Sequence, residues 1–189
     1  ALRDEAAALH GLLADVVDLA RGEAVAWAAA PQPTAVGSLL ADVHHSLSAR
    51  AAARGIALRR HVEPAVPEAL LLDGRRLRQV LLNLASNALR VTDAGEVAVV
   101  ASAEPAGAGR VTLRVAVRDT GPGMTEAQRA HAFEPFWQAT ELPDGRRGAA
   151  GLGLAVAAKL TAQLSGRLEV TSRPGAGSTF TLLLPEVEV

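Results

Sequence analysis

The sequence predicts an α+β fold, a two-layer α/β sandwich in which a mixed sheet carries helices on one face and follows an N-terminal amphipathic helix. The clearest observation is the alternation with period two in "RVTLRVAVRD", where Leu113 and three valines face one way and Arg114 and Arg118 face the other. A second observation is that helical segments separate such strands along the chain. Strands with one apolar face need a layer of helices to cover that face.

Residues 1–27 are predicted as a helix that packs against other helices. In "ALRDEAAALHGLLADVVDLARGEA", Leu2, Leu9 and Val16 repeat every seven residues, and Leu12 and Leu19 occupy the offset register. Such a helix has no core of its own. It therefore needs a partner helix or a second chain to bury its apolar stripe.

Residues 28–37, "AAAPQPTAVG", are predicted as a linker that leads into a domain formed by residues 38–189. Inside this domain a helix is expected over about 38–54 and ends at Gly55. A short strand, "IALRRHV", follows, and then a helix over about 74–90.

The rest of the domain is predicted as two pairs of strands. "GEVAVVASA" and "RVTLRVAVRD" are joined by a flexible hairpin loop, "EPAGAG", while "RLEVTS" and "STFTLLLP" are joined by "RPGAG". A helix over about 152–165 precedes the second pair. The segment 119–150 is too long for a silent connector, so we expect functional residues in it.

Composition excludes several classes of protein. Nineteen basic and twenty acidic residues give the 189-residue chain a net charge near −1, which argues against a nucleic-acid or anionic-membrane partner. The absence of cysteine excludes disulfide scaffolds, thiolate metal sites and cysteine nucleophiles. No apolar run is long enough to span a bilayer, and the mixed charges of "ALRDEAAALH" do not fit a signal peptide.

Two asparagines, Asn83 and Asn87, interrupt the apolar helical run "RQVLLNLASNALRVT". They lie four residues apart and share one helix face, although asparagine is a weak helix former. An amide oxygen can bind Mg²⁺, and Arg90 on the same face could neutralise a phosphate. The alternative is a polar network that ties the helix to a loop, and for Asn83 both interpretations stay open.

Asp119 ends a predicted strand and enters the turn "TGPGM", which Gly121 and Gly123 make tight. A buried carboxylate at this point can accept a hydrogen bond from an amino group, and the glycines let a flat ligand approach the backbone. An ordinary structural turn is the alternative interpretation of this motif.

Gly151 and Gly153 stand where the helix over 152–165 begins, with Leu152 between them. Free amides at a helix N-terminus favour a phosphate. The preceding strand and the third glycine of a dinucleotide-binding motif are missing, and no Gly-Lys-Ser/Thr of a P-loop occurs.

Phe133 and Phe136, in "FEPFWQ", belong to an aromatic cluster in a chain with few aromatic residues elsewhere. A hydrophobic plug that pins the loop is one interpretation, and it is compatible with an anchor for a mobile lid. Arg146 and Arg147 either form a solvated loop tip or reach phosphates.

Taken in order, these motifs resemble the ATP-binding catalytic domain of sensor histidine kinases. They are Asn-x-x-x-Asn-Ala, Asp-x-Gly-x-Gly, Phe-x-Pro-Phe, Gly-Leu-Gly-Leu and Gly-x-Gly-Ser-x-Phe. The resemblance covers about residues 33–185 and implies the α/β sandwich of that family. The segment "LLADVVDLARGEA" is similar to the end of the second helix of the family's dimerisation and phosphoacceptor hairpin.

The resemblance implies a role for each matching residue. Asp119 would bind the adenine amino group, in a pocket shaped by Gly121 and Gly123. Asn87 would hold Mg²⁺ between the phosphates, with Asn83 beside it and Arg90 where the family usually has lysine. The other implied nucleotide contacts are Phe133 and Phe136 as anchors of the ATP lid, and Arg146, Arg147, Gly151, Leu152 and Gly153 near the phosphates.

The implied cofactors are ATP and Mg²⁺. The implied partners are the protein's own phosphoacceptor helix, a homodimer partner and the receiver domain of a response regulator, with no nucleic-acid or membrane contact by this chain. The implied location is the cytoplasm, which includes the cytoplasmic part of a membrane-bound sensor. None of the five histidines has the sequence context of a phosphoacceptor; these are His10, His44, His45, His61 and His131. We therefore expect a fragment that begins inside the hairpin's second helix.

Two positions of the sequence bear on competing functions. Ala149 and Ala150 stand where many relatives have Gly-Thr, which keeps open a degenerate module that signals without catalysis. An ATP hydrolase on the same fold would need a glutamate at the position of Asn83 to activate water, so the sequence favours a kinase. A serine kinase of the anti-sigma type would leave the N-terminal helix unexplained.

Overall fold

The computed structural model describes residues 31–137 and 151–189. Its helices and strands are, in chain order, β1 (Gln32–Thr34), α2 (Val36–Ala53), β2 (Ala57–Val62), β3 (Leu70–Leu72), α3 (Gly74–Val91), β4 (Glu96–Gly107), β5 (Arg110–Asp119), α4 (Glu126–Ala130), α5 (Gly153–Gln163), β6 (Arg167–Ser172) and β7 (Ser178–Glu188). None of the helices in these two ranges is long and apolar enough to cross a bilayer.

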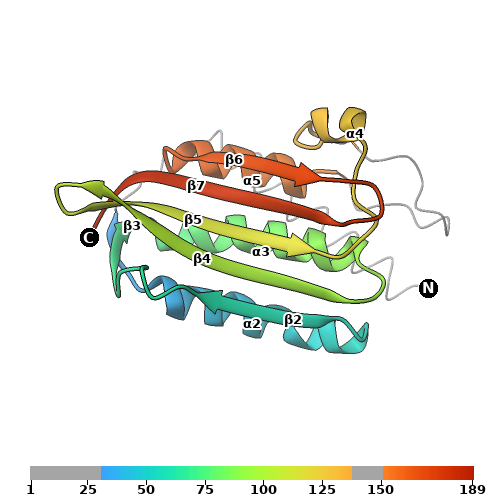
Figure 1. The fold of residues 1–189 in the computed structure, drawn as a ribbon, viewed down its shortest axis with the longest axis horizontal. Helices are drawn as coiled ribbons and strands as arrows, with labels where there is room; N and C mark the ends of the chain where they lie inside the picture. The colour runs from blue at the N-terminus through green and yellow to red at the C-terminus, as the bar shows by residue number, and fades with distance from the viewer. Residues whose placement is uncertain (1–30, 138–150) are drawn as a thin grey trace.

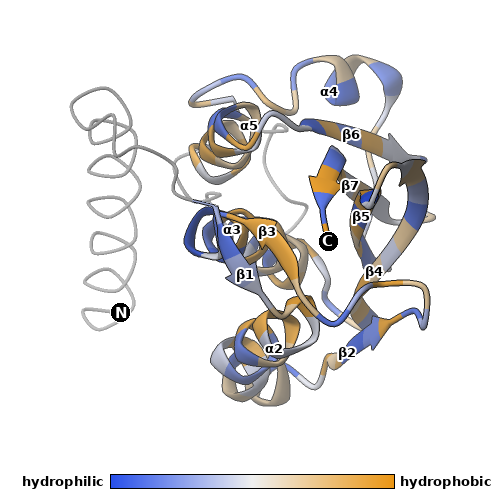
Figure 2. Ribbon diagram, turned by 90° about the vertical axis from the view of Figure 1, so that its left-hand side faces the viewer, coloured by the Kyte–Doolittle hydropathy of each residue, from blue (hydrophilic) through white to orange (hydrophobic). Residues whose placement is uncertain are grey.

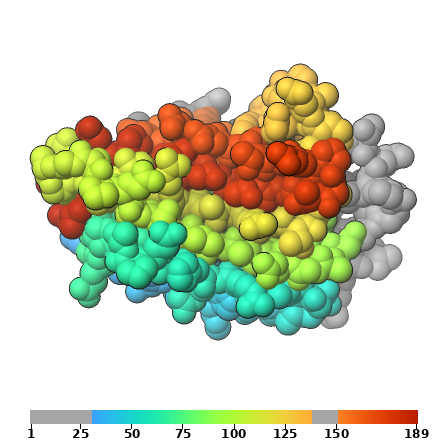
Figure 3. All heavy atoms as spheres, viewed as in Figure 1, coloured from blue at the N-terminus to red at the C-terminus, as the bar shows by residue number. Residues whose placement is uncertain are grey.

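The strands form one mixed sheet in the order β1-β3-β7-β5-β4-β2, with β6 also paired to β7. Only β2 and β4 run parallel among these strand pairs. Helices α2, α3 and α5 cover one face of the sheet (Figures 1 and 2), and the other face is open in the space-filling view (Figure 3). The predicted two-layer α+β sandwich is therefore confirmed, whereas the predicted helix over residues 1–27 lies outside the described residues.

The core lies between the sheet and the helices. Every second residue of β5 from Val111 to Val117 is buried, as the period-two pattern predicts, and Phe180 of β7 is buried beside them. On the helix side, α3 buries Leu77, Leu81 and Leu84 completely and contacts both α2 and α5. This central position fixes α3 firmly against the sheet.

Both ends of α3 are set by short polar side chains. Asp73 is the N-cap, and its carboxylate accepts a hydrogen bond from the Arg76 N–H at 3.0 Å. At the other end the buried Thr92 hydroxyl donates to the Ala88 carbonyl at 2.8 Å. The predicted helix over about 74–90 is thus confirmed, and its last turn ends beside the tip of the sheet.

The structure differs from the sequence prediction in the hairpin between β4 and β5. The predicted loop over 104–109 is shorter, because β4 continues to Gly107 and the turn consists of Ala108 and Gly109 with φ of 46° and 73°. Two central residues with positive φ form the turn type that best matches the twist of a hairpin. A register shift between Pro105 and Gly107 lets the proline lie within the strand.

Three short elements, β1, β3 and α4, were not predicted. Residues 32–34, inside the predicted linker, form β1 and pair with β3. Both strands have three residues, too few to show a periodic pattern, and α4 has five. The division into residues 1–27, 28–37 and 38–189 stays a prediction, although β1 already belongs to the sheet.

Candidate functional site

Asp119, at the end of β5, is buried, with only 2% of its surface exposed. Its Oδ1 atom accepts hydrogen bonds from the backbone N–H groups of Gly121 at 2.9 Å and Ser178 at 3.2 Å. Its Oδ2 atom is also buried but has no hydrogen-bond partner in the described part of the chain. Because buried acceptors are normally satisfied, Oδ2 is an acceptor ready for a ligand N–H group.

The electrostatic state of Asp119 follows from this burial. Loss of water raises the pKa of the Asp119 carboxyl above its ordinary value of 3.8, while the N–H groups of Gly121 and Ser178 act in the opposite direction. A ligand that donates a hydrogen bond to Oδ2 would replace part of the lost solvation.

The two glycines predicted after Asp119 are both required by close approaches. A Cβ atom on Gly121 would lie 2.9 Å from Asp119 Oδ1 and 3.0 Å from the carbonyl oxygen of Val91. Gly123 has a φ of +68°, and a Cβ there would lie 1.9 Å from the Arg173 carbonyl oxygen. The turn therefore brings Asp119, the last turn of α3 and the turn between β6 and β7 together at one end of the sheet (Figure 1).

Serine hydroxyls and a further glycine complete the wall around Asp119, and the sequence interpretation assigned them no role. The buried Ser172 hydroxyl accepts from the Met124 N–H at 2.8 Å and donates to the Gly177 carbonyl at 2.9 Å. It therefore fastens the glycine turn after β5 to the turn between β6 and β7. The only sequence signal was the Gly-x-Gly-Ser motif, in which Gly177 precedes Ser178.

We expect Gly177→Ala to lower the free energy of unfolding by about 3 kcal/mol or more. Gly177 has a φ of +78°, and an added Cβ would lie 2.0 Å from the Asp119 carbonyl oxygen. Gly175→Ala is the matched control, since it has a φ of +75° in the same turn but nothing within 4 Å of its Cβ position. It should cost only about 1 kcal/mol. Urea denaturation of both variants measures the difference, and equal losses would contradict the proposed backbone clash.

The polar residues predicted on α3 do share one helix face. The Arg90 guanidinium donates a hydrogen bond to Asn87 Oδ1, so the two side chains meet directly. Asn83 Oδ1 accepts from Gln79 Nε2 at 3.5 Å, whereas Asn83 Nδ2 is buried without a partner among the described residues. The described contacts of Asn83 therefore lie on its own helix and not on a loop.

Arg54 is a further residue at this end of α3 that the sequence interpretation missed. Its backbone ends α2, and its guanidinium donates to the carbonyl oxygens of Leu89 and Arg90 and pairs with Asp93 at 3.2 Å. The last carbonyls of a helix have no partner within the helix, and a cation there also interacts favourably with the helix dipole. Arg54 therefore holds the turn that carries Asn87 and Arg90.

We expect Arg54→Ala to lower the free energy of unfolding by about 1–3 kcal/mol and to speed amide hydrogen exchange in the last turn of α3. Arg50→Ala is the matched control, because Arg50 also joins α2 to α3, through the Ser86 hydroxyl at 2.9 Å, but on an exposed surface. It should change stability by no more than about 0.5 kcal/mol. If exchange at the end of α3 were equally fast in both variants, the Arg54 contacts would not hold that turn.

The two predicted lid anchors differ in position. Phe133 is half-buried against the core and meets Phe180 edge to face, with ring centroids 6.2 Å apart. The Phe136 ring is 65% exposed, so it does not pack into the described core. Its φ is +64°, and its backbone N–H donates to the Gly151 carbonyl at 3.2 Å, which ties the two described residues to each other.

Gly153 begins α5, as predicted, and among the described residues beyond its own helical turn none lies within 4 Å of its Cβ position. Leu152 is only 1% exposed, so its side chain belongs to the core and only its backbone can contact a ligand. Arg146, Arg147, Ala149 and Ala150 lie outside the described residues. Over the described ranges, no group of three or more histidine, aspartate or glutamate side chains could hold a metal ion by itself.

Comparison with known proteins identifies the family. Residues 72–188 match the model of the histidine kinase-, DNA gyrase B- and HSP90-like ATPases. The chain belongs to this family. Within it, the chain is the ATP-binding catalytic domain of a sensor histidine kinase, as its relatives and its fold indicate.

Two curated relatives extend the match of this histidine kinase domain over nearly the whole chain. The sensor protein TorS of Escherichia coli (strain K12) is 36% identical over 187 residues, which is 98% of this chain and 20% of TorS. The sensor histidine kinase AruS of Pseudomonas aeruginosa is 39% identical over 182 residues, which is 95% of this chain and 18% of AruS. The chain thus spans about a fifth of the length of these relatives.

Solved structures have the same fold as this domain. The crystal structure of full-length ShkA in complex with AMPPNP has a TM-score of 0.81 and 38% identity, and covers 100% of this chain and 38% of that one. The histidine kinase AdeS of Acinetobacter baumannii has a TM-score of 0.72 at 21% identity, covering 98% of this chain and 82% of that one. The second likeness concerns the fold alone.

Proposed function

We propose that this chain binds Mg²⁺-ATP and transfers the γ-phosphoryl group to a histidine on a phosphoacceptor helix that is not part of the chain. The observation that carries the proposal is the buried Asp119 carboxylate, whose Oδ2 atom is an unused acceptor next to a glycine turn. The adenine amino group would donate to Oδ2. Gly121 and Gly123 would shape the pocket for the flat ring, since close contacts with the protein's own atoms leave no room for a Cβ at either position.

The phosphates and Mg²⁺ would lie along the polar face at the end of α3. Asn87 Oδ1 would bind the ion, which usually keeps waters and phosphate oxygens as its other ligands. Because Arg90 donates to this oxygen in the structure, its guanidinium would have to turn to a phosphate when the metal binds. Asn83 would lie beside the ion. The backbones of Gly151, Leu152 and Gly153, with Arg146 and Arg147, would contact phosphate.

The transfer step needs no covalent protein intermediate in this chain. Phosphoryl transfer depends on placing the nucleophile in line and on neutralising charge, and Mg²⁺ supplies much of that neutralisation. The histidine nitrogen would attack the γ-phosphorus, and ADP would leave. In the full protein, the acceptor helix would come from a dimer, and a response regulator would take the phosphoryl group; the cytoplasm is the proposed location.

Binding and transfer can be tested separately. Calorimetry with AMPPNP and Mg²⁺ should show one site per chain, and silence at millimolar nucleotide would favour a degenerate module. Radiolabelled ATP should then label the separately expressed phosphoacceptor hairpin of TorS, as an acid-labile phosphohistidine that is absent without this chain. Rapid release of inorganic phosphate without any hairpin would instead indicate an ATP hydrolase and would contradict the proposal.

A further inference from the structure

The strand β2 forms one edge of the sheet, away from Asp119 and α3. Within the described residues its only strand neighbour is β4. The N–H groups of Ala57 and Glu63 donate to the carbonyl oxygens of Gly95 and Ala101 on the β4 side. Every second residue of β2 therefore directs its backbone groups toward β4, and the residues between them direct theirs away from it. Leu58, Arg60 and Val62 therefore direct their backbone N–H and C=O groups outward, along the free edge.

One outward group of this edge is already occupied. His44, on α2, donates from Nε2 to the Leu58 carbonyl oxygen at 3.2 Å. The backbone groups of Arg60 and Val62 have no strand beside them in the described structure. A further strand can therefore pair along the second half of β2, and the histidine marks the point where such pairing would begin.

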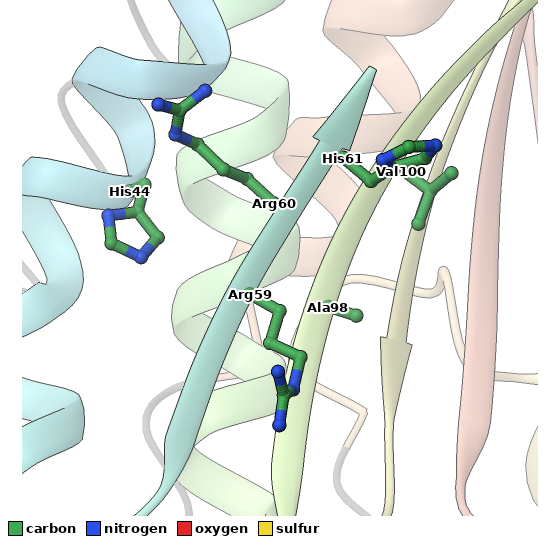
Figure 4. A pocket seen from close by; sticks show the side chains of 6 residues that line it. All are labelled: His44, Arg59, Arg60, His61, Ala98 and Val100. Atoms are coloured by element: carbon green, nitrogen blue, oxygen red, sulfur yellow. The ribbon is translucent and has the colours of Figure 1, made fainter. Parts of the chain in front are cut away.

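Basic side chains flank this edge on both faces of the sheet. An open hollow of about 610 Å³ is lined by His44, Arg59, Arg60, His61, Ala98 and Val100 (Figure 4). Arg59 and His61 are in register with Ala98 and Val100 on the open face of the sheet, whereas Arg60 is in register with the buried Val99 and extends toward α2. No acidic side chain lines the hollow.

The charges of this lining are only partly balanced. Arg59 pairs with Glu96 at 2.8 Å, and both side chains are largely exposed. Arg60 and His61 are exposed and take part in no ion pair among the described residues. The free edge therefore combines unused backbone groups with the uncompensated positive charge of Arg60.

We propose that the edge of β2 docks an extended acidic segment of a partner protein as an additional strand. Backbone pairing with Arg60 and Val62 would supply affinity, as in other strand-addition complexes. Alternate side chains of the docked strand would point to opposite faces, so its acidic residues would meet Arg59 and His61 on one face and Arg60 on the other. This site is separate from the nucleotide site and does not depend on its assignment.

Two other occupants fit less well. A second copy of this chain pairing through the same edge would place the arginines of the two copies near one another, and like charges directly opposite are destabilising. A nucleic acid would meet alternating backbone donors and acceptors, and carbonyl oxygens repel phosphates. The net charge of −1 also gives such a polyanion no general attraction.

The test uses the whole chain labelled with ¹⁵N and a capped octapeptide with the repeated sequence Glu-Glu-Val-Val, which presents glutamate on both faces of a strand. We expect shifts of the amide signals of Leu58, Arg60 and Val62, and amide exchange at Arg60 and Val62 slowed by about tenfold. Arg60→Glu should weaken binding by about tenfold or more. Arg167→Glu, an exposed arginine on β6 at the opposite part of the sheet, is the matched control and should leave binding unchanged.

Four outcomes would overturn the proposal. The first two are that the peptide does not bind at millimolar concentration, and that an octapeptide with glutamine in place of glutamate binds equally well. The other two are that Arg60→Glu and Arg167→Glu lose the same affinity for the peptide, and that single-stranded DNA binds more tightly than the peptide. Circular dichroism and AMPPNP affinity of Arg60→Glu should match the unmodified chain. If the fold of that variant were damaged, Arg60→Gln and the exchange protection of the unmodified chain would decide instead.

Discussion

Asp119→Asn is expected to weaken AMPPNP binding by about 100-fold or more while the domain stays folded. The asparagine oxygen would take the place of Oδ1, because the N–H groups of Gly121 and Ser178 require an acceptor. The amide nitrogen would then stand where Oδ2 is buried without a partner. Two donors, this amide and the adenine amino group, would face each other, and neither would have an acceptor.

The same substitution is expected to remove the pH dependence that Asp119 gives to the stability of the domain. Because burial raises the pKa of Asp119 above 3.8, the folded state favours the protonated carboxyl. The stability that this group contributes is fully present below its unfolded pKa and is lost as the pH rises through the higher folded pKa. The asparagine variant has no such loss, so its stability relative to the unmodified chain should rise as the pH passes through that range.

Calorimetry measures the first effect and urea denaturation between pH 3 and pH 8 measures the second. Asp42→Asn, at an exposed aspartate of α2, is the control and should change neither quantity. Retained affinity in Asp119→Asn would show that the carboxylate does not receive the adenine amino group. A stability difference between the two chains that stays constant from pH 3 to pH 8 would contradict the unfavourable burial of the charge.

Asn87→Ala is expected to remove most of the Mg²⁺-dependent part of nucleotide affinity and to lower phosphoryl transfer to a supplied hairpin by about 100-fold. The substitution removes the amide oxygen that we assign to the ion, and it also releases Arg90 from its hydrogen bond to that oxygen. Binding measured in EDTA should change little, because the adenine half of the site does not involve Asn87.

The comparison of affinities with Mg²⁺ and with EDTA is the decisive measurement for Asn87. Ser86→Ala is a matched control on the same helix, since its hydroxyl meets only the exposed Arg50 side chain in the described hydrogen bonds. An unchanged Mg²⁺ effect in Asn87→Ala would refute the metal assignment. Equal losses with and without Mg²⁺ would indicate that Asn87 supports the helix and not the ion.

The longer elements were predictable because their patterns are local. The burial of β5 follows the alternation of Val111 to Val117, and α3 follows an apolar face bounded by Asp73 and Thr92. Asp119 was also predictable as a buried strand end, since it follows an apolar strand and precedes glycines. The prediction was wrong for the hairpin after β4, where residues 104–107 were assigned to the loop although the strand continues through them past a bulge.

The sequence by itself determined the fold class, the order of the main strands and helices, and the polar face of α3. Only the tertiary structure decided what surrounds them. Ser178 reaches Asp119 across 59 positions of the chain, and Arg54 reaches Leu89 across 35. Periodicity reports which face of an element is apolar, but it carries no information on which distant backbone groups meet at its end. The unused oxygen of Asp119, the arginine at the end of α3 and the free edge of β2 all arise from such meetings, and so they became visible only in the folded chain.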